Sequence, residues 1–285
     1  NIYQLKQYFE EHEDSFSNEK KLSQLKWYGY QSNTQRLTPK TIDFVEAKLR
    51  GSSVCFYHPL WDALELREFH RTTTTNLLKS LDHRVQAVIC YHESWLGIGS
   101  FVPCSFSLDL ISELLKIGSL DALTALFLYW FESAETDQKY TSLLAESIYS
   151  ILLMIGVDLG IPELTEALFL IFCERVFKRT NWKNGIFAIN QSMYLQDCQI
   201  LKNILSNPLI QKKFQRKHDT RHKFTWRLLC NGEHLAIWRG FSVLILPNDS
   251  SAREKLKFWT ENKAYLNSEY GSIIVGNIAS KKIRN

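Results

Sequence analysis

The sequence predicts a mainly α protein with three parts: a small N-terminal helical unit, a helical bundle body and a small C-terminal α+β element. Hydrophobic residues make up 45% and charged residues 22% of the 285 residues, values typical of a globular chain with a buried core. Only 12 Gly and 6 Pro are present, which argues against an all-β fold with many tight turns. Apolar residues recur at helical spacing through most of the chain. We place the three parts at residues 1–51, 52–205 and 206–285.

Charge is distributed unevenly along a chain whose net charge is +4. Residues 101–180 contain five Lys/Arg and eleven Asp/Glu, giving −6, whereas residues 181–285 contain seventeen and seven, giving +10. This asymmetry indicates two functional surfaces, one acidic and one basic, and the basic surface could bind a polyanion. The first 21 residues are polar and charged, and no uncharged apolar run reaches about 18 residues. We therefore expect no signal peptide, no membrane span and a cytoplasmic location.

The N-terminal part is expected to be helical. Residues 1–12 and 19–28 carry apolar side chains at helical spacing and predict two short helices. A third helix begins at Pro39 after the capping residue Thr38, because proline at the first helical position loses no hydrogen bond. It is expected to end near Leu49.

The stretch KWYGYQSNTQRLTPKTIDFVEAKL at residues 26–49 combines an aromatic residue, a polar loop and a Pro-started helix. It resembles the later half of a Cro/CI-type helix-turn-helix domain, in which an aromatic residue closes the recognition helix and a polar loop with a basic residue follows. The positions that correspond are Trp27, Arg36, Pro39, Ile42, Val45 and Leu49. The resemblance covers residues 20–50 and implies DNA binding by a docked helix. The alternative is a small helical subdomain with a coincidental Trp and Pro.

The same resemblance implies a set of DNA contacts. Residues 20–26 would lie near the groove, and the polar loop would contact phosphates. The candidate residues are Lys20, Lys21, Lys26, Gln31, Asn33, Gln35 and Arg36.

A second basic stretch, QKKFQRKHDTRHKFTWR, occupies residues 211–227 with seven Lys/Arg and one Asp. Basic side chains neutralise phosphates, and the interleaved Phe214, Phe224 and Trp226 could stack on bases or anchor the segment. The alternative is an ordinary solvated surface segment. The candidate contacts here are Lys212, Lys213, Arg216, Lys217, Arg221, Lys223 and Arg227.

The body is expected to contain a series of helices. Residues 54–58 (VCFYH) predict a short strand or a buried connector. Helices are predicted from Pro59 to Glu68 and, after Thr72–Thr75, through Leu77, Leu78 and Leu81. Residues 82–95 carry apolar side chains at Val85, Val88, Ile89 and Tyr91. Four longer helices follow, with Ser107 and Ser119 as N-caps and Gly118 as a stop. Their short connections predict a bundle of antiparallel helices, at 107–116, 119–136, 140–153 and 162–177.

The C-terminal part is expected to mix helix and strand. A polar connector at 178–190 leads to a helix at 192–205. Asn231-Gly232 is a strong hairpin signal and predicts a β-meander. Its strands would lie at 224–230, 233–238 and 241–246. A helix at 252–262, with Leu256 and Trp259 inward, and a strand at 270–278 complete the prediction.

The six cysteines form no CxxC pair, so we expect buried free thiols, no metal site and no cofactor. No GxSxG, HExxH, Walker A or kinase motif occurs, and we expect no catalytic residues. His92-Glu93 is the most enzyme-like pair, which we interpret as a surface or core pair. An enzyme whose site assembles from distant residues remains an alternative.

We therefore expect a bacterial DNA-binding protein, either a transcriptional regulator or a mobile-element accessory factor. It would act by phosphate neutralisation and helix docking. The alternative is a protein-interaction module of effector or immunity type, which would use the acidic helical face of residues 101–180 and bind no DNA. Monomer and homodimer both remain open, because helices this aromatic often bury more surface than one chain can cover.

Overall fold

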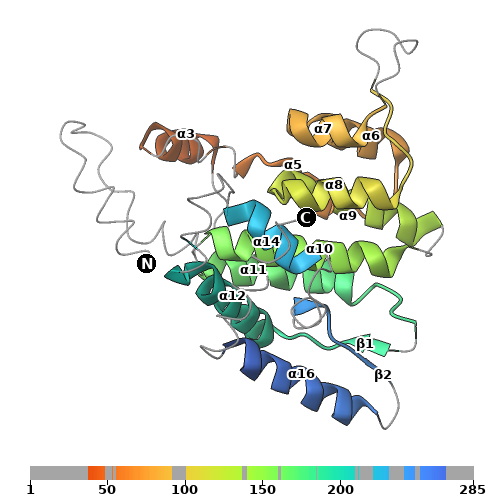
Figure 1. The fold of residues 1–285 in the computed structure, drawn as a ribbon. Helices are drawn as coiled ribbons and strands as arrows, with labels where there is room; N and C mark the ends of the chain where they lie inside the picture. The colour runs from red at the N-terminus through yellow and green to blue at the C-terminus, as the bar shows by residue number, and fades with distance from the viewer. Residues whose placement is uncertain are drawn as a thin grey trace, which may run out of the picture. The chain divides into compact units, whose positions relative to one another are not determined.

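The structure is a computed structural model that describes residues 38–48, 53, 56–91, 101–136, 140–159, 162–183, 185–208, 211, 221–230, 241–247 and 251–267. Its described elements are helices and one small antiparallel sheet, which confirms the expected mainly α fold with a small α+β element (Figure 1). The chain divides into two compact units, Asn1–His58 and Pro59–Asn285. The helices expected at 1–12 and 19–28 and the strand at 270–278 lie outside the described residues.

The first unit contains helix α3 (Pro39–Lys48), which begins at the predicted proline. The N–H of Ile42 donates to the carbonyl of Thr38 at 3.0 Å, and the side chain of Ile42 is buried. After the helix, the backbone N–H of Ser53 donates to the Glu46 carboxylate at 2.7 Å.

The strand or buried connector expected at 54–58 is wrong for the residues described there. The N–H of Tyr57 donates to the carbonyl of Ser53 at 3.0 Å, as in a helical turn. Phe56 and Tyr57 are 37% and 60% exposed. Although aromatic residues favour strands, these two are in a helical turn and their side chains are not buried.

The second unit is built from helices and a π-helix. Their bounds are α5 (Pro59–Glu65), α6 (Arg71–Lys79), α7 (His83–Ile89), α8 (Leu108–Ile117), α9 (Leu120–Thr136), α10 (Thr141–Leu159), α11 (Pro162–Phe172), η2 (Cys173–Phe177), α12 (Gln191–Ser206), α14 (Arg221–Cys230) and α16 (Ala252–Asn267). Two strands, β1 (Gly185–Phe187) and β2 (Ile245–Pro247), pair antiparallel.

The predicted helix boundaries around α8 and α9 are confirmed. Ser107 Oγ accepts a hydrogen bond from the N–H of Leu110 at 3.1 Å, and Ser119 Oγ accepts one from the N–H of Ala122 at 3.2 Å. Gly118 ends α8 with φ 56°, a left-handed conformation that favours glycine.

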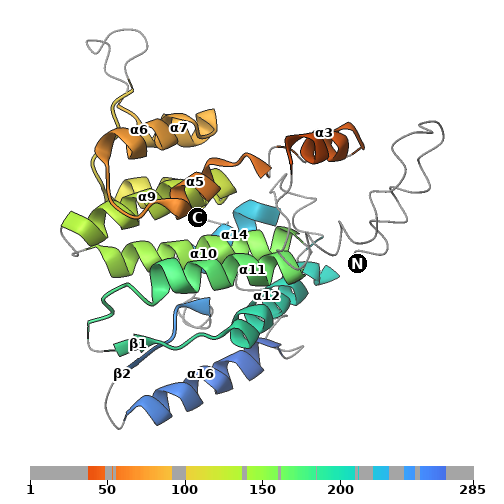
Figure 2. The same cartoon turned by 180° about the vertical axis from the view of Figure 1, so that it is seen from behind.

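Helix α10 lies at the centre of the second unit and packs against α8, α9, α11, α12 and α14 (Figures 1 and 2). These neighbours explain why α10 is apolar around most of its circumference, because each apolar face is buried against another helix. Within the described part of the chain, its segment Thr141–Asp158 is the one helix long and apolar enough to cross a membrane. That segment is 67% buried inside the protein, as a central bundle helix must be.

Gly156 in α10 sets how closely α11 and α12 approach. A Cβ atom at this position would lie 2.8 Å from both Cys198 Sγ and Thr165 Cγ2, and 2.9 Å from Tyr194 Oη. Real Cβ contacts are longer than this, so the absence of a side chain allows the three helices to meet.

A buried polar chain joins α10, α12 and α16. Tyr149 Oη donates to Asp197 Oδ2 at 2.8 Å, and the Lys263 ammonium pairs with the other carboxylate oxygen. The ammonium also lies 4.6 Å from the ring centroid of Phe241 and 4.8 Å from that of Trp259. Burial raises the pKa of Asp197 and lowers the pKa of Lys263, so each charged form depends on its partner.

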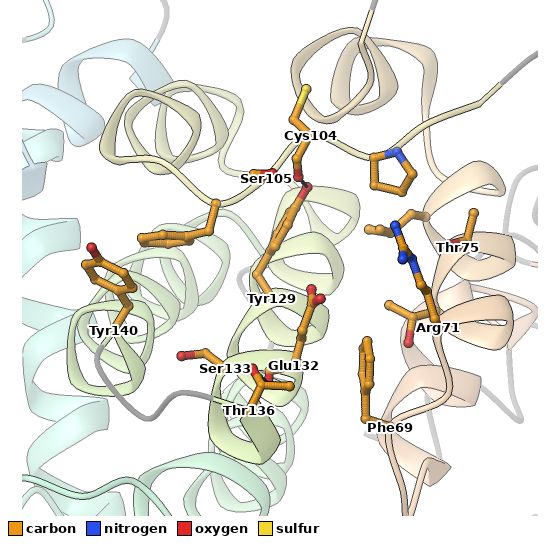
Figure 3. Close-up of a pocket in the computed structure, with 14 residues that line it drawn as sticks. Phe69, Arg71, Thr75, Cys104, Ser105, Tyr129, Glu132, Ser133, Thr136 and Tyr140 are labelled. Carbon is orange, nitrogen blue, oxygen red and sulfur yellow. Dashed lines mark hydrogen bonds between the residues drawn. The ribbon is translucent and has the colours of Figure 1, made fainter.

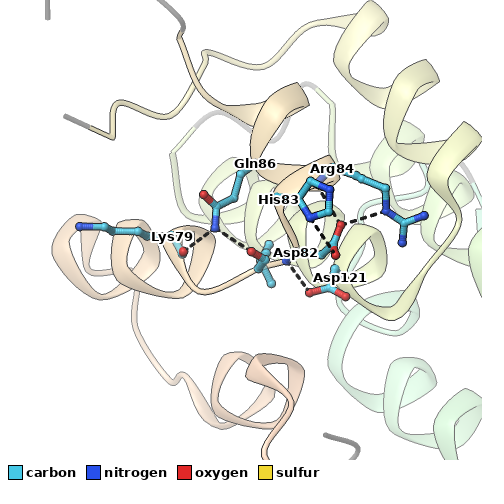
Figure 4. Close-up of polar contacts among 7 residues, drawn as sticks. Lys79, Asp82, His83, Arg84, Gln86 and Asp121 are labelled. Carbon is cyan, nitrogen blue, oxygen red and sulfur yellow. Dashed lines mark hydrogen bonds and ion pairs between the residues drawn. The ribbon is translucent and has the colours of Figure 1, made fainter. Parts of the chain in front are cut away.

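The junction between α6 and α7 is fixed to the start of α9 (Figure 4). The N–H of Asp82 donates to Asp121 Oδ1 at 2.9 Å, while the Asp82 carboxylate caps α7 by accepting from the N–H of Arg84 at 2.9 Å. That backbone hydrogen bond lowers the pKa of Asp82. The Gln86 amide donates to the carbonyls of Lys79 and Leu81, at 2.7 Å each. Helix α6 is thereby held at a fixed place beside α9.

The predicted β-meander is wrong in its first strand, and its third strand pairs with a different partner. Residues 224–230 belong to helix α14, where Thr225, Leu228 and Leu229 are buried at helical spacing. Strand β2 does form within the third expected segment, but it pairs with β1, which lies in the expected polar connector. Residues 231–240, including the predicted hairpin turn, lie outside the described residues.

Several side chains differ from their expected burial. Leu256 is 41% exposed, although it was expected to face inward. The five described cysteines are free, as expected, but only Cys198 is buried. Helix α10 continues to Leu159, six residues beyond the predicted end at 153.

We predict that Gly156→Ala lowers the free energy of unfolding by up to about 2 kcal/mol. Alanine favours the helix by about 1 kcal/mol, but overpacking costs about 1–3 kcal/mol. Urea unfolding measures the change. Cys198→Ala in the Gly156→Ala background should recover part of the loss, because it removes one of the atoms that the new methyl group meets. A Gly156→Ala protein more stable than the parent would contradict the close packing.

We further predict that Lys263→Met destabilises the protein by about 3–5 kcal/mol, because it leaves a buried carboxylate without its cation. The double variant Asp197→Asn/Lys263→Met should be clearly more stable than Lys263→Met alone. Chemical denaturation of the four proteins of this cycle gives the coupling energy. Strictly additive effects would show that the two charges are independent.

Candidate nucleic-acid interface

Most of the predicted DNA contacts lie outside the described residues. These are Lys20, Lys21, Lys26, Gln31, Asn33, Gln35, Arg36, Lys212, Lys213, Arg216 and Lys217. Arg221, Lys223 and Arg227 belong to α14, and of these only the side chain of Arg227 is described, as partly buried. The predicted contacts therefore remain a prediction.

Helix α14 uses the aromatic end of the basic stretch for internal packing. It lies against α8 and α10, and the Lys116 ammonium is 5.5 Å from the centroid of the Trp226 ring. A partly buried indole with a cation over its face is engaged within the protein. Trp226 is thus better explained as an anchor of α14 than as a stacking platform for bases.

A different basic feature is described completely: three arginines from two distant segments. Arg175 Nη2 in η2 donates to the carbonyl of Leu66 at 2.6 Å, which places Arg175 beside Arg67. Arg179 follows Arg175 by four residues, one helical turn further along. We call Arg67, Arg175 and Arg179 the arginine cluster.

The backbone that carries Arg175 has π-helical geometry, and Arg179 lies in the turn that follows it. The N–H of Lys178 donates to the carbonyl of Cys173 at 3.0 Å, five residues earlier. Such segments are rare and often occur at functional sites. Here the wider turn shifts the positions of Arg175 and Arg179 relative to a regular continuation of α11.

Two tryptophans hold this segment in place. The indole N–H of Trp130 donates to Thr180 Oγ1 at 3.0 Å, and Thr180 Oγ1 donates to the carbonyl of Val176 at 2.9 Å. The indole N–H of Trp182 donates to the carbonyl of Phe177 at 2.8 Å. Because Trp130 belongs to the core helix α9, the cluster is presented by a rigid scaffold.

The arginine cluster has no carboxylate partner among the described residues. The nearby Glu174 carboxylate pairs with Lys178 and raises the pKa of that lysine. None of the three arginines takes part in an ion pair in the described part of the chain. Burial, together with the positive charges of Arg179 and Arg67, lowers the pKa of Arg175. An anion bound here would relieve this repulsion, and guanidinium groups suit phosphate oxygens in particular.

The cluster was not predicted from the sequence. Residues 101–180 carry −6 in total, and this average hides Arg175 and Arg179. Arg67 lies more than 100 residues earlier, so no local window contains all three. The pattern RVFKR at 175–179 was the one available signal.

Four carboxylates of the expected acidic face are in different surroundings. Glu166 accepts a hydrogen bond from the Gln191 amide, and Glu174 pairs with Lys178. Glu146 lies in a hollow beside α8 and α14, where burial raises its pKa. Glu132 lies in another cavity, between α6 and α9. These four carboxylates therefore have four different sets of neighbours.

No group of three His, Cys, Asp or Glu side chains is placed to hold a metal ion within the described ranges. His92-Glu93, the most enzyme-like pair of the sequence, lies outside those ranges.

Comparisons with known proteins give no independent indication of function, since no protein-family model, curated protein or solved structure matches the chain.

Proposed function

We propose that the protein binds DNA through phosphate contacts, as a bacterial transcriptional regulator or a mobile-element accessory factor in the cytoplasm. The observation that carries this proposal is the arginine cluster, three guanidinium groups on a rigid scaffold without carboxylate partners in the described structure. Clustered like charges are unfavourable until an anion neutralises them. The excess of ten positive charges over residues 181–285 adds to the attraction for a polyanion.

Recognition of a specific DNA sequence would come from a part of the chain other than the arginine cluster. Phosphate contacts fix the position of a protein on a duplex but carry little sequence information. The helix-turn-helix resemblance of residues 20–50 supplies the candidate for groove contacts. The proposal therefore assigns affinity to the basic side chains and specificity to the N-terminal unit.

A second copy of the chain is proposed as a further partner. Helix α11 exposes Leu164, Leu170 and Ile171 by 45%, 43% and 38%. Leu164 and Ile171 are seven residues apart and lie on one stripe of the helix, and Leu170 lies about 100° to the side of Ile171. Two-fold contact between identical stripes would cover this apolar surface. A dimer would also double the number of phosphate contacts on one duplex.

The double variant Arg67→Gln/Arg179→Gln tests the proposed DNA binding. We expect its affinity for a fluorescent duplex to fall about tenfold or more at low salt, because charge-assisted contacts to phosphate are lost. Fluorescence anisotropy measures the dissociation constant. Lys202→Gln, which removes an exposed positive charge on α12, is the matched control and should bind like the parent.

Two outcomes would contradict the proposal. One is that the parent protein binds no duplex of any sequence at low salt. The other is that the arginine double variant and Lys202→Gln bind equally well. A stable protein partner in the absence of any duplex binding would favour the interaction-module alternative.

The proposed dimer is tested by Leu164→Glu. We expect this charge on the α11 stripe to lower the mass in solution from two chains to one, as measured by sedimentation equilibrium at micromolar concentration. Leu108→Glu, at an exposed leucine of α8, is the control and should leave the mass unchanged. A parent protein that is already monomeric under these conditions would rule out the dimer.

A further inference from the structure

A cavity of about 380 Å³ lies between α6, residues 103–106, α9 and Tyr140 (Figure 3). Its volume is in the range of small-molecule sites. Part of its wall is fixed by Tyr129, whose hydroxyl donates to the carbonyl of Cys104 at 3.0 Å. Another part is formed by Phe106 and Tyr140, whose ring centroids are 4.5 Å apart.

Two hydroxyl groups in this cavity have no hydrogen-bond partner in the described structure. Thr74 Oγ1 and Ser133 Oγ are both shielded from solvent and unpartnered. The whole Thr74 residue is only 5% exposed. A buried hydroxyl without a partner costs about 1–3 kcal/mol, and such groups are rare in folded proteins. They indicate polar groups that a ligand would satisfy.

The cavity also carries one cation and one anion on facing helices. Arg71 of α6 and Glu132 of α9 both line it, and Figure 3 shows their charged ends on opposite sides of the space. Neither takes part in any described ion pair, although each faces a residue of opposite charge. A guanidinium suits a carboxylate, and a carboxylate suits an ammonium group.

The rest of the wall is mixed, with the polar residues Thr75, Ser105 and Thr136 beside an apolar part. Phe69, Leu78 and Phe106 line this apolar part together with Tyr140. An aliphatic or aromatic group could therefore lie between the two charged ends, since ligand sites combine apolar walls with a few polar anchors.

From these features we infer that the cavity binds a small zwitterion with an apolar side group, of the kind represented by a free amino acid with a large side chain. Arg71 binds the carboxylate, Glu132 binds the ammonium group, and Thr74 and Ser133 hydrogen-bond to the polar end of the ligand. This site is separate from the arginine cluster, so the inference does not depend on DNA binding.

Calorimetric titration of the full chain tests the inference with L-phenylalanine and L-leucine as probes. We expect saturable binding of at least one. L-Phenylalaninamide, which lacks the carboxylate, and N-acetyl-L-phenylalanine, which lacks the ammonium group, should each bind about 10- to 100-fold more weakly than L-phenylalanine. L-Alanine should also bind more weakly, because it leaves the apolar wall unfilled.

Variants assign each charge to its partner. In Arg71→Gln the amide and the free amino acid should bind equally well, because the group that recognises the carboxylate is gone. In Glu132→Gln the N-acetyl compound and the free amino acid should bind equally well. Lys79→Gln on α6 and Glu135→Gln on α9 are exposed, matched controls that should retain the selectivity of the parent.

Thr74→Val separates binding from folding. It keeps the shape of the side chain and removes a hydroxyl that has no partner, so thermal stability should not fall. Ligand affinity should fall nonetheless. The inference is overturned if neither amino acid binds at millimolar concentration, or if Arg71→Gln and Glu132→Gln keep the selectivity of the parent.

Discussion

The second unit depends on the close contact of α10 with α11 and α12 at Gly156. Without a side chain at this position, Cys198, Thr165 and Tyr194 reach the backbone of the central helix. This approach brings Tyr149 within hydrogen-bond distance of Asp197, which in turn holds Lys263 in α16. One glycine thus makes room for the polar chain that fastens the C-terminal helix to the bundle.

The same packing gives the functional surfaces their rigidity. Phe177 and Phe169 pack around the ring of Tyr149, so the π-helix that contains Arg175 and leads to Arg179 is anchored in the core. Trp130 fixes that segment from α9, and α9 also carries Glu132 of the zwitterion cavity. Preorganised charged groups bind ligands with a smaller loss of conformational entropy than mobile ones.

Helix caps and helix ends could be predicted from the sequence, because they depend on neighbouring residues. Contacts between segments distant in sequence could not. Ser107, Gly118 and Ser119 act within a few residues of their own position, and their capping roles were predicted correctly. The pairing of β1 with β2 joins segments about 60 residues apart. The strand pattern near β2 is visible in the sequence, but nothing local marks β1 or the pairing of the two segments. The Asn-Gly pair that follows α14 predicted a hairpin and therefore a strand at 224–230. The buried side chains of this segment repeat at helical spacing, and the segment is a helix. The arginine cluster and the zwitterion cavity were missed for the same reason as the sheet, because each is assembled from segments distant in sequence.

The central claim is that positive charges without partners in the described structure neutralise the phosphates of a duplex. The salt dependence of DNA affinity tests it most directly, because each phosphate contact releases counterions and steepens the fall of log K with log salt by about 0.9. For the parent protein we predict that the logarithm of the DNA-binding constant falls steeply and linearly with the logarithm of salt concentration. The slope should be shallower by roughly 2 to 3 when Arg67, Arg175 and Arg179 are all replaced by Gln. Equal slopes for the two proteins, or no binding at the lowest salt concentration, would contradict the account.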